Sequence, residues 1–310
     1  MDYWWRKLEE VLASPAVQAA FPIVAVDVGN NRIKCGWYEW TAMREGGPYS
    51  AERALSQLPQ QLSELEAFAA RGELRGGWWI ATVNRAASTE LIDWIRTHRP
   101  EDRIVLLTAS DLPLPVNLPR PDMVGIDRLV DALAGFYLRR ESGPIVVVDV
   151  GSAITVDFVS AEGVFEGGAI LPGLGLAARA LYEFTDMLPL VDSREFNEPP
   201  PPVGKNTVAA MKSGLFWGAL GAVAQLAGQM LREAGAPGEI ILTGGGSTIF
   251  ARLLGEAGAE QSPFRKQKGG GAEFTLEHFG RSVRVRHVPH LTLLGVALAA
   301  GWVMATTQWR

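Results

Sequence analysis

Two glycine turns in this sequence carry side chains that suit phosphate and cation binding. The first lies in DVGNNRIK, where four apolar residues lead to an aspartate, a turn and a second apolar segment. Glycine leaves room for a phosphate close to backbone N–H groups, amides and lysine can bind oxygen atoms, and aspartate can hold a cation through water. Asparagine and glycine are also ordinary hairpin residues, so a β-hairpin without a ligand stays open. The candidate ligands are Asp27, Gly29, Asn30, Asn31 and Lys34.

The second turn, in DVGSAIT, repeats this arrangement 122 positions later. Asp149 again ends an apolar strand, and Ser152 and Thr155 offer hydroxyl groups in place of the lysine. The separation is too long for a solenoid repeat and fits a duplicated domain. A plain hairpin again explains either turn alone. Two such turns on duplicated sheets, however, can face each other across a cleft and hold opposite sides of a nucleoside triphosphate.

The segment GIDR at 125–128 supplies residues for proton transfer. It follows a proline-rich stretch and begins a helix with apolar periodicity. Asp127 can accept a proton from a substrate hydroxyl, and Arg128 can bind an anion. Phosphoryl transfer needs these parts: an oriented hydroxyl, a base and positive charge near the triphosphate. An aspartate at the beginning of a helix is also a common N-cap, and that alternative stays open.

Three further segments place polar or glycine residues just before helices. GGAILPG at 167–173 and LTGGGS at 242–247 suit close contact with a nucleotide, and GKNT at 204–207 offers Thr207 as a polar contact. Ordinary turn chemistry explains the first two equally well, and Thr207 can be only a helix cap.

Strand and helix patterns alternate along the chain, which predicts an α/β protein. The SGP at 142–144 is the expected seam between two lobes. We therefore expect a helical extension over 1–22, one lobe over 23–141 and a second over 142–310. Helical stripes are expected at Leu55–Leu65, after Asp127 and at Val208–Leu231. Apolar β-rich runs occur at 23–29, 33–40, 77–83, 103–108, 145–151, 154–160, 239–245 and 283–288.

Composition excludes several classes of protein. A net charge of -5 gives no electrostatic reason to bind nucleic acid. The apolar run from Leu291 is 17 residues long, shorter than a membrane span, and predicts a buried helix. Apolar residues at helical spacing near the N-terminus predict an amphipathic helix: Trp4, Leu8 and Val11, with Trp5 and Leu12 beside them. It could dock on this protein, on a partner subunit or on a membrane surface, and docking on protein is favoured because the polar face is not rich in Lys or Arg. The first residues lack a signal-peptide pattern, and Cys35 is the single cysteine, so we expect a cytoplasmic protein.

No familiar hydrolase, P-loop or metal signature is present. The four histidines show no metal-ligand spacing, and we interpret them as structural or surface groups. The loop SPFRKQKGGGAE at 262–273 is basic and rich in glycine, and is expected to link two elements.

Taken in order, DVGNNRIK, GIDR, DVGSAIT, GGAILPG and GKNT resemble the motif series of type III pantothenate kinases, within the acetate and sugar kinase, Hsp70 and actin superfamily. The resemblance begins near Ile23. It implies two ribonuclease-H-like lobes, a homodimer, and transfer of the γ-phosphate of ATP to pantothenate with Mg²⁺ and a monovalent cation, K⁺ or NH₄⁺.

The resemblance also implies roles for individual residues. Asp27 to Lys34 corresponds to the phosphate-binding loop and Ser152 to an ATP-binding hydroxyl. Asp149 corresponds to the monovalent-cation ligand. The pantothenate segment is Gly125, Ile126, Asp127 and Arg128, with Asp127 as the proton acceptor, and Thr207 corresponds to a pantothenate contact made across the dimer interface.

Three positions depart from the family pattern. Asn31 and Ser152 stand where threonine is usual, and both keep a small polar group. Leu118 stands where relatives commonly carry a tyrosine near pantothenate, which removes a hydroxyl group from the substrate pocket. Two alternatives follow: a kinase for another small alcohol, and a non-catalytic nucleotide-binding accessory or regulatory protein.

Overall fold

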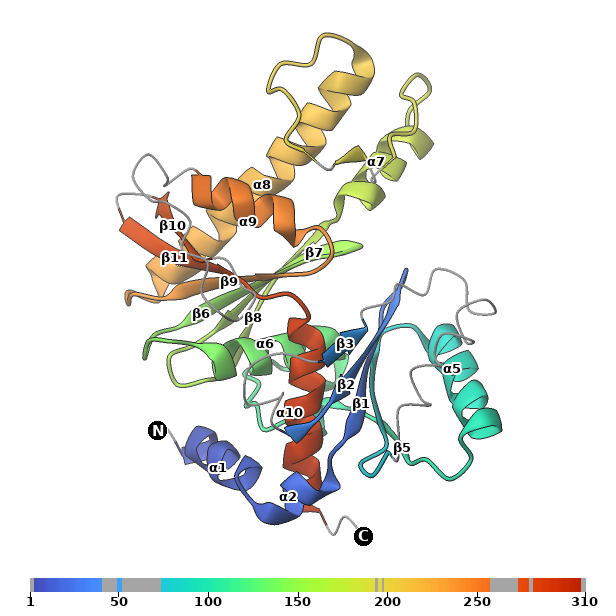
Figure 1. Cartoon of the computed structure of the whole chain (residues 1–310). Coiled ribbons are helices and arrows are strands. Elements are labelled where there is room, and N and C mark those ends of the chain that lie inside the picture. The colour runs from blue at the N-terminus through green and yellow to red at the C-terminus, as the bar shows by residue number, and fades with distance from the viewer. Residues whose placement is uncertain are drawn as a thin grey trace. The chain divides into compact units, whose positions relative to one another are not determined.

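The computed structural model describes residues 3–40, 49–51, 74–192, 195–196, 198–256, 273–278 and 281–307. The predicted α/β class is confirmed, because these residues form two separate mixed sheets with helices around each (Figure 1). The chain divides into two compact units. Unit 1 comprises 1–138, 162–165 and 290–310, and unit 2 comprises 139–161 and 166–289. The stripe expected at Leu55–Leu65 lies outside the described residues, as does the basic loop at 262–272.

Unit 1 is built on a five-stranded sheet in the order β3-β2-β1-β4-β5. Strand β1 pairs antiparallel with β2 and parallel with β4, and β4 pairs parallel with β5. All six residues of β1 are buried, which explains why five of them are apolar; the sixth is Asp27. The strands are β1 (Ile23–Val28), β2 (Ile33–Tyr38), β3 (Tyr49–Ala51), β4 (Trp78–Thr82) and β5 (Ile104–Leu106).

Helices α5 (Arg85–His98), α6 (Ile126–Leu138) and α10 (Leu291–Thr306) pack in unit 1, with short 3-10 turns η1 (Ala109–Asp111) and η2 (Pro121–Met123). Helix α10 is apolar on all sides and almost wholly buried, as its composition predicted. It packs against α6 and β1. A Cβ added at Gly295 would lie 2.0 Å from the carbonyl oxygen of Val130, so glycine is what permits the close approach of α10 and α6.

The N-terminal extension forms α1 (Tyr3–Leu12) and α2 (Pro15–Ala20), and it docks on α10 as expected (Figure 1). Leu8 is fully buried, and Leu12 lies where a Cβ on Gly301 would meet it at 2.5 Å. The Lys7 ammonium stands 5.7 Å from the Trp302 ring centroid, a cation–π distance. The extension therefore covers one end of the apolar C-terminal helix.

Unit 2 is built on a six-stranded sheet in the order β10-β11-β9-β6-β7-β8. Strand β6 pairs antiparallel with β7 and parallel with β9, β9 pairs parallel with β11, and β10 adds an antiparallel edge. The strands are β6 (Ile145–Val150), β7 (Ala153–Val159), β8 (Phe165–Pro172), β9 (Glu239–Thr243), β10 (Glu273–His278) and β11 (Arg281–His287). The helices are α7 (Leu174–Glu183), α8 (Thr207–Glu233) and α9 (Ser247–Glu256).

Helix α8 is the one helix in the described part of the chain that is long and apolar enough to cross a membrane by length and composition. Its residues Phe216, Val223 and Ala227 are buried in the core of unit 2. A third of its most apolar 18-residue window is buried, so one face of α8 packs on this core.

The two sheets share one topology, which explains the repeated sequence. Strands β8-β7-β6-β9-β11 follow the same order as β3-β2-β1-β4-β5. The pairs among β7, β6, β9 and β11 also run in the same directions as those among β2, β1, β4 and β5, so β6 is the counterpart of β1 and β7 of β2. This is the duplicated ribonuclease-H-like arrangement that the family resemblance implied.

The division into units differs from the expected lobes at three places. The seam falls between Leu138 and Arg139, a few residues before 142–144, and residues 162–165 belong to unit 1. Residues 290–310 also join unit 1 instead of the C-terminal lobe. The physical reason is that α10 buries its apolar surface against α6 and β1. The sequence did not predict that residues 290–310 pack in the first unit.

Candidate active site

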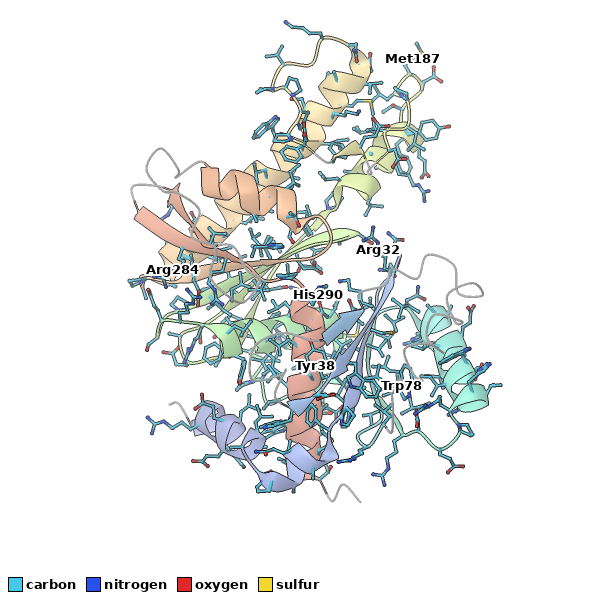
Figure 2. The ribbon with its side chains drawn as sticks, in the orientation of Figure 1. Arg32, Tyr38, Trp78, Met187, Arg284 and His290 are labelled. Carbon is cyan, nitrogen blue, oxygen red and sulfur yellow. The ribbon has the colours of Figure 1, made fainter. Side chains whose placement is uncertain are left out.

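The first DVG turn joins β1 to β2 and brings two opposite charges together. Asp27 and Lys34 face each other across the antiparallel pair, and Lys34 Nζ lies 3.4 Å from Asp27 Oδ2. Both side chains are largely buried, so this pair is less screened than a surface ion pair. The N–H of Gly29 donates to the carbonyl of Arg32 at 2.9 Å, which closes the turn. Asn30, Asn31 and Arg32 are exposed at the tip, where Figure 2 labels Arg32.

Asp127 lies in the first turn of α6, directly after Ile126. Its Oδ1 accepts a hydrogen bond from the backbone N–H of Arg128 at 2.9 Å. Burial raises the pKa of this carboxyl above its ordinary value, and the Arg128 hydrogen bond and the charges of Arg128 and Lys34 only partly oppose the rise. Asp127 is thus close enough to Lys34 to interact electrostatically. Residues about a hundred positions apart in the sequence form one charged cluster: Asp27, Lys34, Asp127 and Arg128.

Gly125 and Arg128 complete this end of α6. A Cβ on Gly125 would lie 2.5 Å from Asp127 Oδ1, so glycine gives the carboxylate its space. The Arg128 guanidinium lies 5.7 Å from the ring centroid of Phe165, which is fully buried. The backbone of Phe165 bonds the proline-rich segment on both sides, from its N–H to Pro115 O at 2.8 Å and from Asn117 N–H to its carbonyl at 2.9 Å. Half-buried Leu118 follows directly.

The second DVG turn, in unit 2, also joins two antiparallel strands, but it is one residue shorter than the first. Gly151 N–H donates to Ala153 O at 2.9 Å, whereas Gly29 N–H donates to Arg32 O, three residues further along the chain. Asp149 is half-buried opposite Thr155, and Ser152 is exposed on the turn. Thr155 therefore occupies the position that Lys34 holds in unit 1, and the charge of the aspartate is not offset by a lysine at that position.

Both of the other glycine segments in unit 2 meet this turn. Gly173, before α7, donates its N–H to Ser152 O at 3.1 Å, and a Cβ there would lie 2.4 Å from Gly151 O. Gly244, after β9, has φ +94°, and a Cβ there would lie 2.1 Å from Asp149 Oδ1. The structure thus brings GGAILPG and LTGGGS to Asp149, although simple turn chemistry could have explained each alone.

The residues around Asp149 suit a hard cation. They offer the Asp149 carboxylate and tightly packed backbone atoms of Val150 in a space that a side chain on Gly244 would fill. Oxygen ligands of this kind are those that hard cations prefer. Within the described residues no group of three or more His, Cys, Asp or Glu side chains could hold a metal ion.

Thr207 is the exposed first residue of α8. The cap is Asn206, whose Oδ1 accepts the N–H of Ala209 at 2.9 Å, so Thr207 is not the residue that caps the helix. A Cβ on Gly204 would lie 2.2 Å from Ala210 N, so the GKNT segment folds tightly on the first turn.

The end of β4 is a part of the site that the sequence reasoning missed. Val83 N–H donates to Val28 O at 3.1 Å, and Val83 Cγ1 lies 3.7 Å from the Cβ position of Gly125. It is 37% exposed. The sequence could have indicated this position. The carboxyl ends of parallel strands meet at one edge of a sheet, and β4 is parallel to β1, so the end of β4 is expected beside the first DVG turn.

A comparison with known protein families matches residues 23–229 to the model described as type III pantothenate kinase. This chain belongs to that family. A type III pantothenate kinase from Rhodopirellula baltica is 36% identical over 262 residues, which cover 77% of this chain and 94% of the relative. The one from Anaeromyxobacter dehalogenans is 33% identical over 232 residues, 74% of this chain and 89% of the relative.

Among solved structures, the acetate kinase from Entamoeba histolytica aligns with 89% of this chain and 98% of its own at 11% identity and a TM-score of 0.44. The family match begins at Ile23, so helices α1 and α2 precede the matched residues.

Proposed function

We propose that this protein transfers the γ-phosphoryl group of ATP to the primary hydroxyl of pantothenate, giving 4′-phosphopantothenate and ADP, the first step of coenzyme A synthesis. Membership of the type III pantothenate kinase family over residues 23–229 is the observation that carries this function. The assignment of roles to individual residues is our own, and it rests on the geometry of each unit.

Asp127 is the proposed base. The hydroxyl oxygen of pantothenate forms the new bond to the γ-phosphorus while its proton passes to Asp127, and the bond between that phosphorus and the ADP oxygen breaks with its electrons going to ADP. A carboxylate whose pKa is raised by burial holds a proton more readily than an ordinary aspartate, which suits this role. Its place at the first turn of α6, beside Lys34 and Arg128, supports the assignment.

The turn residues are proposed to bind ATP. Gly29, Asn30 and Asn31 would offer backbone and amide groups to phosphate oxygens, with Lys34 as the cation and Ser152 as a hydroxyl contact. Asp27 would hold Mg²⁺ through water, the usual mode for an ion that keeps part of its hydration shell. Mg²⁺ supplies charge neutralisation on the phosphates, and the buried Asp27–Lys34 pair fixes the lysine toward the turn.

Asp149 is proposed to hold the monovalent cation, K⁺ or NH₄⁺. In unit 1 the equivalent aspartate, Asp27, is paired with Lys34, whereas Asp149 is paired with Thr155. The bound cation would supply the positive charge that Lys34 supplies in unit 1. Removal of K⁺ is expected to weaken nucleotide binding, and equilibrium dialysis of ADP with and without K⁺ measures it.

Pantothenate is proposed to bind the segment Gly125 to Arg128, with the cationic guanidinium of Arg128 on its carboxylate. Phe165 and the proline-rich segment hold Arg128 and Leu118 in place. Thr207 is proposed to contact pantothenate bound to a second copy of the chain.

A homodimer in the cytoplasm is the proposed assembly. Large apolar side chains are exposed around α7 and the beginning of α8, and Met187, labelled in Figure 2, is 84% exposed. Exposed apolar side chains that gather in one region can mark an interaction surface, and the exposed Thr207 is next to Val208 in the sequence. Sedimentation of Phe184→Glu beside the unmodified protein tests the dimer, which the variant should dissociate. The exposed set is Ile170, Leu176, Tyr182, Phe184, Met187, Leu190, Val203 and Val208.

The function is tested with purified protein, ATP, Mg²⁺ and pantothenate, with and without K⁺, by detection of 4′-phosphopantothenate. Formation of that product supports the proposal. If another alcohol is phosphorylated in direct competition with pantothenate, the protein is instead a kinase for another small alcohol, the alternative suggested by Leu118. Nucleotide binding with no turnover of any hydroxyl substrate would favour a non-catalytic accessory protein.

A further inference from the structure

Ser247 makes two hydrogen bonds inside unit 2 that do not belong to the proposed chemistry. It is the first residue of α9 and is fully buried. Its Oγ lies 2.6 Å from the carbonyl oxygen of Gly244 and 2.8 Å from Nε2 of His287 at the end of β11. These bonds join the segment Gly244–Ser247 to the end of β11, 40 residues later in the chain.

The direction of these bonds follows from the number of protons. A serine hydroxyl has one proton, and a carbonyl oxygen can only accept, so Ser247 donates to Gly244. The hydroxyl must then accept from His287, which assigns a proton to Nε2 of that histidine. The two hydrogen bonds therefore run from His287 to Ser247 and from Ser247 to the carbonyl of Gly244.

Gly244 is the residue that approaches Asp149 most closely in the glycine loop. A Cβ there would stand 2.1 Å from Asp149 Oδ1 and 2.7 Å from both the nitrogen and the oxygen of Val150. Gly246 N–H also donates to Val150 O at 2.9 Å. Rotation of the peptide that carries the Gly244 carbonyl would move this backbone against the Asp149 carboxylate. The hydroxyl of Ser247 and its backbone N–H, which lies 3.1 Å from the same carbonyl oxygen, both oppose that rotation.

We infer that Ser247 and His287 are positioning residues that hold the Gly244 loop against Asp149 and so set the affinity of this turn for cation and nucleotide. The inference rests on the proposed role of Asp149. Ser247 is fully buried and is proposed to act on the turn through the Gly244 carbonyl, with His287 acting through its bond to Ser247.

The test compares three variants with a matched control. Ser247→Ala removes the hydroxyl that donates to Gly244 and accepts from His287. His287→Ala removes the donor to Ser247, and His287→Gln keeps an N–H donor at that position. Ser88→Ala is the control, because the buried Ser88 likewise donates to a carbonyl three residues earlier, Arg85 O at 3.0 Å, in a helix of unit 1. The Kd of Mg-ADP is measured calorimetrically at several K⁺ concentrations, and the KM of pantothenate is measured separately.

Ser247→Ala is expected to weaken ADP binding roughly three- to tenfold, the loss of one hydrogen bond, and to raise the K⁺ concentration for half-maximal binding. His287→Ala removes only the donor that orients the Ser247 hydroxyl, so it should weaken ADP binding in the same direction but by a smaller factor. His287→Gln should restore most of that affinity, and Ser88→Ala and the pantothenate KM should not change.

Equal ADP affinity in Ser247→Ala and Ser88→Ala would overturn the inference. If Ser247→Ala fails to fold, His287→Ala leaves the Ser247–Gly244 bond in place and decides the question by the same measurement. ADP binding is measured directly, so the two ideas can fail separately. If the unmodified protein binds ADP but does not phosphorylate pantothenate, the proposed function is wrong, while the ADP affinities of the variants still test the inference about Ser247 and His287.

Discussion

Gly244→Ala would test whether the close approach of the glycine loop to Asp149 is essential. The substitution adds one methyl group and leaves every charge in place. At this position the methyl group meets the Asp149 carboxylate and the Val150 backbone, and it requires a residue other than glycine at φ +94°. Gly235 is the matched control, because it also has positive φ, +67°, but a Cβ there meets nothing within 4 Å.

The expected magnitudes separate two effects. Alanine in the left-handed region costs about 1–2 kcal/mol, so Gly235→Ala should lower the free energy of unfolding by that amount. Gly244→Ala incurs the same strain. Its methyl group would also lie 2.1 Å from Asp149 Oδ1 and 2.7 Å from backbone atoms that cannot turn aside like a flexible side chain. Forcing a methyl group into a packed site costs about 1–3 kcal/mol more. Gly244→Ala should therefore lose about 2–5 kcal/mol.

Urea unfolding of both variants and of the unmodified protein gives these free energies, and ADP titration at low and saturating K⁺ gives the effect on the turn. Displacement of the Asp149 carboxylate should leave Gly244→Ala with little response of ADP affinity to K⁺, while Gly235→Ala responds as the unmodified protein does. Equal losses of stability in the two variants, with K⁺ dependence retained in both, would show that the contact with Asp149 has no functional consequence.

Asp127→Asn should reduce the pantothenate kinase rate roughly 10²- to 10⁴-fold, the usual contribution of a general base, while its free energy of unfolding at pH 7 should equal or exceed that of the unmodified protein. The sign follows from the raised pKa of Asp127. The stability that protonated Asp127 contributes is fully present below the unfolded-state pKa and is lost as pH rises through the folded-state pKa. The ionised carboxylate therefore destabilises the folded protein at pH 7. A wild-type rate in the folded variant would remove the base assignment. Asn206→Ala should cost about 0.5–2 kcal/mol in urea unfolding because it removes the N-cap of α8, and no loss would mean that the capping bond to Ala209 is unimportant. Leu8→Ala should cost about 2–5 kcal/mol with unchanged KM values, because Leu8 is fully buried in the extension that docks on α10; an unchanged melting temperature would contradict that docking. Leu118→Tyr should lower the KM of pantothenate if a tyrosine hydroxyl at this position contacts the substrate, and steady-state kinetics would reject the idea by showing no change or an increase.

The sequence determined the local parts of this protein. Runs of apolar residues that end in Asp-Val-Gly predicted β1 and β6, and the repeat of that pattern predicted the duplicated sheet. The buried character of α10 followed from its composition. These features are local, because a strand, a turn or a buried helix is specified by neighbouring residues and their periodicity.

Only the tertiary structure decided which parts meet. Lys34 is near Asp127 because β1, β4 and α6 pack in one unit, and α10 returns to that unit because its apolar surface fits α6 and β1. The meeting of Gly173 and Gly244 at the Asp149 turn depends on the order of strands in unit 2. The bond between Ser247 and His287 was equally hidden, since the histidine was interpreted as structural or surface-exposed from the sequence. Contacts of this kind depend on strand order, register and the fit of packed surfaces, which residues distant in sequence determine jointly.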